Sequence, residues 1–196
     1  MRIVLASGNP GKIREIQALL APYGVRILPQ TAFAIPEIEE TAPTFVENAL
    51  TKARNAARYA GLPALADDSG LEVEALNGAP GVYSARYAGP GADDARNNAK
   101  LLEALTGLEE KDRGARFRCV LVFVRHPYDP SPLIAEGTWE GVITTQPRGE
   151  GGFGYDPLFY LPELGRTSAQ LAAEEKNRLS HRGKALQRLL ELWGNR

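Results

Sequence analysis

Strand-like and helix-like segments alternate along this chain, and this alternation limits the folds that it can adopt. Residues 2–6 and 26–28 are short apolar runs typical of strands, and apolar side chains recur at helical spacing between them. The clearest strand is predicted over residues 116–125, where β-branched and aromatic side chains dominate the sequence RFRCVLVFVR. Such alternation is typical of an α/β fold built in layers.

Helix boundaries can be predicted from capping residues and from apolar periodicity. Thr44 followed by Glu47 is a capping-box pattern, so a helix is expected to begin there and to stop at Gly61. Residues 93–105 and 180–193 are predicted as two further helices.

Two more regions have the character of strands. Residues 64–66 are expected to form a short strand that runs directly into the polar sequence DDSG. Residues 133–145 are predicted to hold two strands, because Gly137 or Gly141 interrupts their pattern.

Length and charge restrict the possible functions. The chain has 196 residues, which favours one domain over two. Its 23 basic and 24 acidic residues give a net charge of −1, which argues against a dedicated nucleic-acid binder. The apolar runs fall far short of the ~18 residues of a membrane span, and no signal peptide is expected. The single cysteine, Cys119, is expected in the core of a protein kept in a reducing cytoplasm.

A glycine-rich turn, SGNPGK at residues 7–12, separates the first strand from the first helix. Such a turn presents backbone N–H groups at a helix N-terminus, which suits a phosphate. Lys12 falls in the first turn of the helix, where a cation costs about 0.3–1 kcal/mol against the helix dipole unless an anion lies beside it. A plain turn with a solvated lysine is the alternative. The turn is not a Walker A loop, because Ala6 and Ile13 stand where glycine and Ser or Thr belong.

Two acidic pairs are candidates for metal or proton chemistry. Asp67 and Asp68 follow an apolar strand, and ligands of open α/β sheets bind beyond the carboxyl ends of strands. Neighbours in a strand point to opposite faces, so one of the two is expected to face the site. The second pair, Glu39 and Glu40, gains weight only as a partner of Asp68, because Mg²⁺ prefers one or two carboxylates with phosphate oxygens and waters. Solvated acids in a turn and in a loop are the alternatives.

The segment GEGGFGYDP, residues 149–157, contains a formal G-x-G-x-x-G pattern. No helical pattern follows it, so a dinucleotide fingerprint is rejected. Phe153 lies between glycines and is followed by Asp156. This arrangement suits a loop that stacks on a planar ring and hydrogen-bonds to the edge of the ring. A long glycine-rich hairpin is the alternative.

Basic residues gather near the last predicted helix. Ser180 is a suitable N-cap, so His181 and Arg182 would be cations at a helix N-terminus, with Lys176 shortly before them. A solvated cap is the alternative. The cysteine and histidine spacing gives no support for zinc, and the absence of a G-x-S-x-G motif gives none for serine hydrolysis.

Taken together, these segments resemble the inosine triphosphate pyrophosphatase family, which hydrolyses non-canonical purine nucleoside triphosphates. The matching segments occur in the same order as in the family and extend over nearly the whole chain. They are SGNPGKIREI (7–16), EETAPTFVENALTKA (39–53), ADDSGLEVEALNGAPGVYSARYAG (66–89), GGFGYDPLF (151–159) and SHRGKAL (180–186).

The resemblance implies an elongated, two-lobed α/β protein with a central mixed β-sheet flanked by helices and an active-site cleft between the lobes. It implies one domain over residues 1–196 and a cytoplasmic homodimer without nucleic-acid or membrane partners. It also implies a Mg²⁺-dependent hydrolase that converts ITP, dITP, XTP and dXTP to the monophosphate and pyrophosphate.

The resemblance further implies roles for individual residues. Glu40 and Asp68 would bind the metal, with Asp68 also the base and Lys12 the second catalytic residue. The residues implied to bind the phosphates are Ser7, Gly8, Asn9, Pro10, Gly11, Lys12 and Lys52. Those implied to surround the nucleotide, mostly at the base, are Ser69, Phe153, Gly154, Tyr155, Asp156, Lys176, His181 and Arg182.

Two other functions stay open. A related pyrophosphatase for modified pyrimidines would share the fold, although the donors Lys176, His181 and Arg182 speak against it. A non-catalytic nucleotide-binding module would be expected to lose an acid such as Asp68, which is present here.

Overall fold

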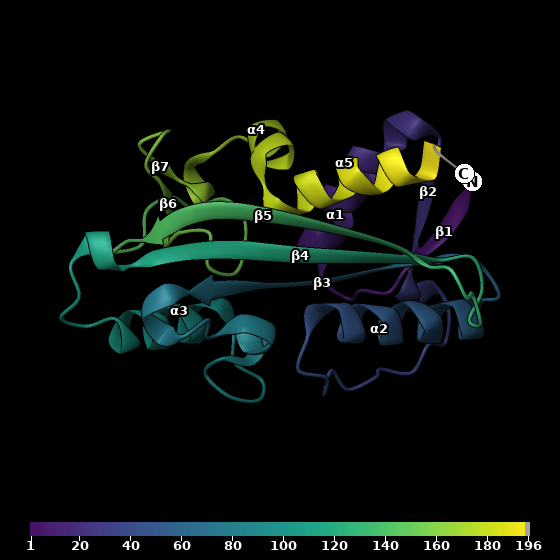
Figure 1. Ribbon diagram of the computed structural model, residues 1–196, viewed down its shortest axis with the longest axis horizontal. Helices are drawn as coiled ribbons and strands as arrows, with labels where there is room; N and C mark the ends of the chain where they lie inside the picture. The colour runs from purple at the N-terminus through teal and green to yellow at the C-terminus, as the bar shows by residue number, and fades with distance from the viewer. Residues whose placement is uncertain (195–196) are drawn as a thin grey trace. The chain divides into compact units, whose positions relative to one another are not determined.

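A computed structural model describes residues 1–194 and confirms the α/β class with a mixed sheet flanked by helices (Figure 1). The strands pair in the order β2-β1-β3-β4-β5-β6-β7. β1 is parallel to β2 and to β3, whereas β5-β6 and β6-β7 are antiparallel. The strands are β1 (Arg2–Leu5), β2 (Arg26–Pro29), β3 (Ala64–Val73), β4 (Gly114–Val124), β5 (Leu133–Ile143), β6 (Phe159–Leu161) and β7 (Arg166–Thr167).

The α-helices of the described chain are α1 (Pro10–Leu20), α2 (Phe45–Ala60), α3 (Asp94–Ala104), α4 (Ala173–Leu179) and α5 (His181–Gly194). The predicted boundaries of α2 are confirmed. Thr44 accepts a hydrogen bond from the backbone N–H of Glu47 at 3.4 Å, and the helix ends at Gly61 in the left-handed conformation. The short helix α4 was not predicted, because its sequence AEEKNRL offers little apolar periodicity.

The chain divides into two compact units, and each has its own hydrophobic core. Unit 1 contains residues 1–68 and 119–137 and the described residues from 181 onward. Unit 2 contains residues 69–118 and 138–180. The prediction of a single domain over residues 1–196 stays a prediction.

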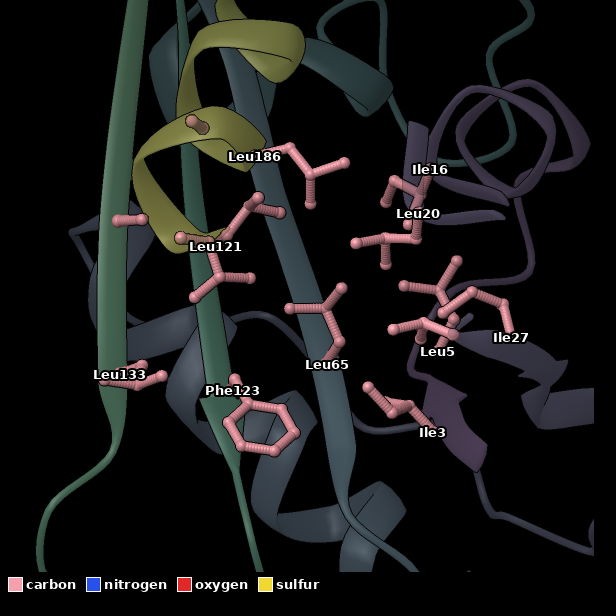
Figure 2. Packing of buried hydrophobic residues seen from close by; sticks show 14 of the residues in the cluster. Ile3, Leu5, Ile16, Leu20, Ile27, Leu65, Leu121, Phe123, Leu133 and Leu186 are labelled. Atoms are coloured by element: carbon pink, nitrogen blue, oxygen red, sulfur yellow. The ribbon is translucent and has the colours of Figure 1, made fainter. Parts of the chain in front are cut away.

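The core of unit 1 lies between the sheet and two helices. Ile16 and Leu20 of α1 and Leu186 of α5 point toward Leu65 and Leu121 of the sheet (Figure 2). Within this unit, α2 covers the opposite face of the sheet (Figure 1). The sheet of unit 1 is therefore buried on both faces, which explains why its strands read as continuous apolar runs.

The core of unit 2 is built around aromatic side chains. The ring of Phe159 lies 4.5 Å from that of Phe117 and 5.5 Å from that of Trp139, measured between centroids. Leu71 and Leu101 are completely buried in the same cluster. The strands and α3 therefore close a separate core in this unit.

Two strand predictions were wrong. β3 does not stop at residue 66 but continues through Asp67 and Asp68 to Val73. β5 is one unbroken strand, not two strands split at a glycine. Gly137 is required by packing, because a Cβ at this position would lie 2.0 Å from the carbonyl oxygen of His181 at the start of α5. A glycine inside a strand can thus mark a close backbone approach and not a break.

Among the described residues, no helix combines the length and apolar character that crossing a membrane requires.

Candidate active site

Asp67 and Asp68 lie side by side in β3 and serve two different clusters. Asp67 contacts Lys12 of α1 and Arg182 of α5. Asp68 contacts Lys52 of α2. Because adjacent residues of a strand point to opposite faces, the two carboxylates meet helices on opposite sides of the sheet. One of the two was expected to face the site; in the structure Asp68 lies beside Lys52, which also binds the predicted metal ligand Glu40.

The carboxylate of Asp67 is completely buried and is held by cationic and thiol donors. Arg182 donates from Nε to Oδ2 at 2.8 Å, Lys12 forms an ion pair with Oδ1, and the thiol of Cys119 lies 3.2 Å from Oδ2. Burial alone would raise the pKa of Asp67, but the charges of Arg182 and Lys12 outweigh it and hold this pKa well below its usual value. Asp67 is therefore a fixed buried anion.

The guanidinium of Arg182 joins three elements of unit 1. It is 2% exposed, and it binds Glu15 of α1 as well as Asp67 of β3. Burial would lower its pKa, but the charges of Asp67 and Glu15 raise it. Arg182 was predicted at the base of the nucleotide. In the structure two of its nitrogen atoms are bonded to protein carboxylates, so the role at the base stays a prediction.

Lys52 forms hydrogen bonds with both predicted metal ligands. Its Nζ donates to Oε1 of Glu40 at 2.7 Å and to Oδ1 of Asp68 at 2.9 Å. It also donates to the carbonyl oxygen of Asp67 at 2.9 Å. Burial acts to lower the pKa of Lys52, but Asp68 and Glu40 raise it overall, so its charge persists.

The two carboxyl groups beside Lys52 differ in proton affinity. Burial raises the pKa of Asp68 to about 6; Lys52 opposes this change and the charge of Glu40 adds to it. Burial also acts to raise the pKa of Glu40, but Lys52 outweighs it and lowers this pKa. A carboxyl group with a pKa near the working pH suits a general base. Asp68 is thus the better placed of the two for proton transfer.

The fit of a metal ion can be judged from the donor set. In residues 1–194 no three His, Cys, Asp or Glu side chains lie close enough together to hold a metal ion. The predicted ligand set is therefore limited to the two carboxylates of Glu40 and Asp68. Oδ2 of Asp68 is buried and accepts no hydrogen bond from the described residues. Two carboxylates with one buried oxygen left to coordinate fit Mg²⁺, which completes its octahedron with waters and phosphate oxygens.

The SGNPGK turn connects β1 to α1 as predicted, but its helix N-terminus is not open. Oδ1 of Asn9 accepts from the backbone N–H groups of Gly11 at 2.8 Å and Lys12 at 3.1 Å. Oγ of Ser7 accepts from the N–H of Asn9 at 3.1 Å. The expected anion beside Lys12 is the carboxylate of Asp67. Lys12 is therefore the cationic side chain of this turn, and its predicted role at the phosphates stays a prediction.

In unit 2, Asp156 organises the glycine-rich loop. Its Oδ2 accepts from Nζ of Lys176 at 2.6 Å and from the N–H of Phe153 at 2.8 Å, and its Oδ1 accepts from Ser168 at 2.6 Å. Nζ of Lys176 also lies 4.8 Å from the centre of the Phe153 ring. The loop therefore combines an aromatic face with a buried ion pair.

The other predicted residues fall in both units. His181 is buried at the start of α5 in unit 1. Ser69 is half-buried in β3, and Gly154 and Tyr155 lie in the loop before β6; all three belong to unit 2. The hydroxyl of Tyr155 donates to the carbonyl oxygen of Ser84 at 2.7 Å, which anchors the loop.

Sequence reasoning missed the part played by Asp67 and Glu15. Asp67 was noticed only as the neighbour of Asp68, and no role was predicted for Glu15. Their partner Arg182 lies 115 residues beyond Asp67 in the chain. The only signal was an unusual cation in the first turn of each of two helices, which called for a nearby anion.

Comparisons with known proteins match nearly the whole chain and indicate the same family. The model of the Ham1 family matches residues 3–192. A dITP/XTP pyrophosphatase of Thioalkalivibrio sulfidiphilus is 62% identical over 191 residues, covering 97% of both chains. One from Escherichia coli O157:H7 is 54% identical over 194 residues, covering 99% of this chain and 98% of its own. Among solved structures, a HAM1 protein from Coxiella burnetii superimposes with a TM-score of 0.91 at 53% identity, covering 100% of both chains. The Ham1 protein of Staphylococcus aureus gives 0.85 at 42% identity, again covering 100% of both.

Proposed function

Because this chain belongs to the Ham1 family, we propose that it hydrolyses dITP, ITP and XTP to the monophosphate and pyrophosphate. The observation that carries the proposal is the cluster of Lys52 with Glu40 and Asp68, two carboxyl groups whose pKa values the charge of Lys12 in the SGNPGK segment also acts to lower. Relatives more than 50% identical over nearly the full chain bear the name dITP/XTP pyrophosphatase. The proposal would place the protein among the enzymes that remove non-canonical purines from the nucleotide pool.

Unit 1 contains the groups that phosphoanhydride hydrolysis needs. The negative charge of a triphosphate requires cations, and the proposal gives this role to Lys12 of the SGNPGK turn and Lys52 of α2. The attacking water needs a group that accepts its proton, and Asp68, with its pKa raised to about 6, is suited to accept it. Lys52 holds Asp68 and Glu40 in one geometry through two hydrogen bonds. This network orients the base before the substrate arrives.

Mg²⁺ belongs to the proposal as the cofactor, held by Glu40 and Asp68. When bound, it would supply a positive charge that neutralises the phosphate oxygens. The chain itself would provide the two carboxylates and the buried Oδ2 of Asp68. We further infer from the family resemblance that the protein is cytoplasmic and forms a homodimer. Light scattering of the purified protein tests the dimer.

Recognition of the base is assigned to the glycine-rich loop of unit 2, and the predicted roles of His181 and Arg182 stay predictions. Phe153 would stack on the purine, and Lys176 would donate to an acceptor on the edge of the base. The C6 keto oxygen of hypoxanthine and xanthine is such an acceptor, whereas adenine carries an amino donor there. Sites built around a required hydrogen bond can discriminate by roughly 10⁴-fold. The exclusion of guanine, which shares the keto group, must arise near C2.

A substrate panel tests this proposal. With Mg²⁺ held constant, we expect ITP, dITP and XTP to be good substrates, dGTP to be poor, and dATP to have a kcat/KM lower by roughly 10⁴-fold. Pyrophosphate and phosphate are to be measured separately, and pyrophosphate is expected. Hydrolysis of dATP within about tenfold of dITP would show that the pocket does not distinguish the C6 group. Preference for a modified pyrimidine such as a dCTP derivative would favour the pyrimidine alternative.

A further inference from the structure

Two side chains of α3 hold the loop that carries Phe153, although neither belongs to the glycine-rich motif. Oδ2 of Asp94 accepts a hydrogen bond from the backbone N–H of Gly154 at 2.6 Å. Nδ2 of Asn98 donates to the backbone carbonyl of the same glycine at 3.0 Å. The two residues are one helical turn apart on α3, so their side chains lie on the same face of the helix. We call this pair the α3 clamp.

The clamp acts at a glycine of the loop that has open space on the side where a Cβ would lie. Gly154 has a φ of +62°, and a Cβ built on it would meet no atom within 4 Å. Gly152 differs, because a Cβ there would lie 2.0 Å from the carboxylate of Asp156. Glycine loses more conformational freedom than other residues when it is ordered. The hydrogen bonds of the clamp supply the restraint that steric contact does not supply at Gly154.

The peptide groups that the clamp holds lie next to Phe153. The N–H of Gly154 belongs to the peptide bond that joins it to Phe153, and on the other side the N–H of Phe153 donates to Asp156 at 2.8 Å. The backbone on both sides of Phe153 is therefore held, once by Asp156 and once by Asp94. With both peptide groups held, the direction in which the Phe153 side chain leaves the backbone is set, and its ring centre lies 4.8 Å from Nζ of Lys176.

The side-chain amide of Asn98 has one buried oxygen atom that lowers the stability of the protein. Its Oδ1 is buried and finds no hydrogen-bond partner among residues 1–194. A buried amide acceptor without a partner destabilises a protein. The nitrogen atom of the same amide gives a reason for an asparagine at this position, because Nδ2 donates to the carbonyl of Gly154.

From this geometry we propose that Asp94 and Asn98 are positioning residues for base recognition, setting where Phe153 lies for stacking on the purine. The inference rests on the proposed function, because it assumes that Phe153 contacts the base. Neither residue is expected to act on the phosphates, since the hydrogen bonds of both side chains go to the backbone of Gly154. The clamp should therefore affect binding of the nucleotide through its base alone.

The test compares a ligand with a base to one without. In Asn98→Ala and Asp94→Ala, KM for dITP should rise about fivefold, the effect of losing one hydrogen bond, with kcat within about twofold of wild type. Inhibition by inorganic tripolyphosphate, which has no base, should be unchanged. Asp94→Asn keeps an acceptor for the N–H of Gly154 and should restore most of the affinity for dITP. Arg96→Ala, an exposed position on the same helix, is the control.

Equilibrium binding of dITP, measured beside turnover, separates the two proposals. A wild-type protein that binds dITP without cleaving it refutes the proposed function and leaves the clamp to be judged by the dissociation constants. Equal affinity for dITP in wild type and in both alanine variants overturns the clamp. A parallel loss of dITP and tripolyphosphate affinity also overturns it, because the variants would then disturb the whole protein and not the base contact.

Discussion

Asp68→Asn is expected to lower kcat by roughly 10²–10⁴-fold, the usual contribution of a general base. The amide cannot accept a proton from the attacking water, and it is a weaker ligand for a divalent cation than a carboxylate. The overall fold should survive, because Oδ1 of the asparagine can still accept the hydrogen bond that Lys52 donates at 2.9 Å. The measurement is kcat for dITP at saturating Mg²⁺, together with the dissociation constant of dITP.

A matched control for this prediction is Asp112→Asn, the same substitution at an exposed acid of unit 2. It should leave kcat unchanged. If Asp68→Asn has near-wild-type kcat at saturating Mg²⁺, the assignment of Asp68 as the base is wrong. If higher Mg²⁺ restores full activity, the residue acts through metal binding and not as a base.

The elements of the fold that could be predicted from the sequence are those with local signals. The helix that starts after Thr44 has its cap and its stop within one short segment, and the apolar run of residues 116–125 is unmistakably a strand. β3 was cut short because Asp67 and Asp68 look like the end of an apolar strand. In the structure they remain in the strand because cations from α1, α2 and α5 compensate them. That compensation depends on contacts between distant segments, which local patterns do not reveal.

The same reason explains why the close approach at Gly137 and the carboxylate partners of Arg182 were not predicted. Gly137 looks like an interruption of β5, and only the close approach of α5 shows why the strand needs a residue without a Cβ. Arg182 was correctly recognised as a cation out of place at a helix N-terminus. A nearby anion was the right physical expectation, but a ligand phosphate and a protein carboxylate satisfy it equally. The structure identifies Asp67 and Glu15 as anions that meet this need.

Arg182→Met is expected to lower the free energy of unfolding by about 3–5 kcal/mol, because removing one partner of a buried ion pair leaves the other charge uncompensated. Asp67 is fully buried and would lose the guanidinium of Arg182 while keeping its ion pair with Lys12. Methionine fills much of the volume of the arginine stem, so the loss reflects charge more than a cavity. In a protein of this size the midpoint of thermal unfolding should fall on the order of 10 °C. Urea denaturation gives the free energy directly.

Arg188→Met provides the control on the same helix. Arg188 is 65% exposed, and its guanidinium lies 3.6 Å from Glu191, so its loss should change stability by no more than about 1 kcal/mol. A double variant that also carries Asp67→Asn should recover part of the stability lost in Arg182→Met, because the buried charge is then removed together with its partner. If Arg182→Met is as stable as Arg188→Met, Asp67 does not depend on Arg182 for compensation. In that case the ion pair does not hold α1, β3 and α5 together, and the stability of unit 1 must rest on its apolar core.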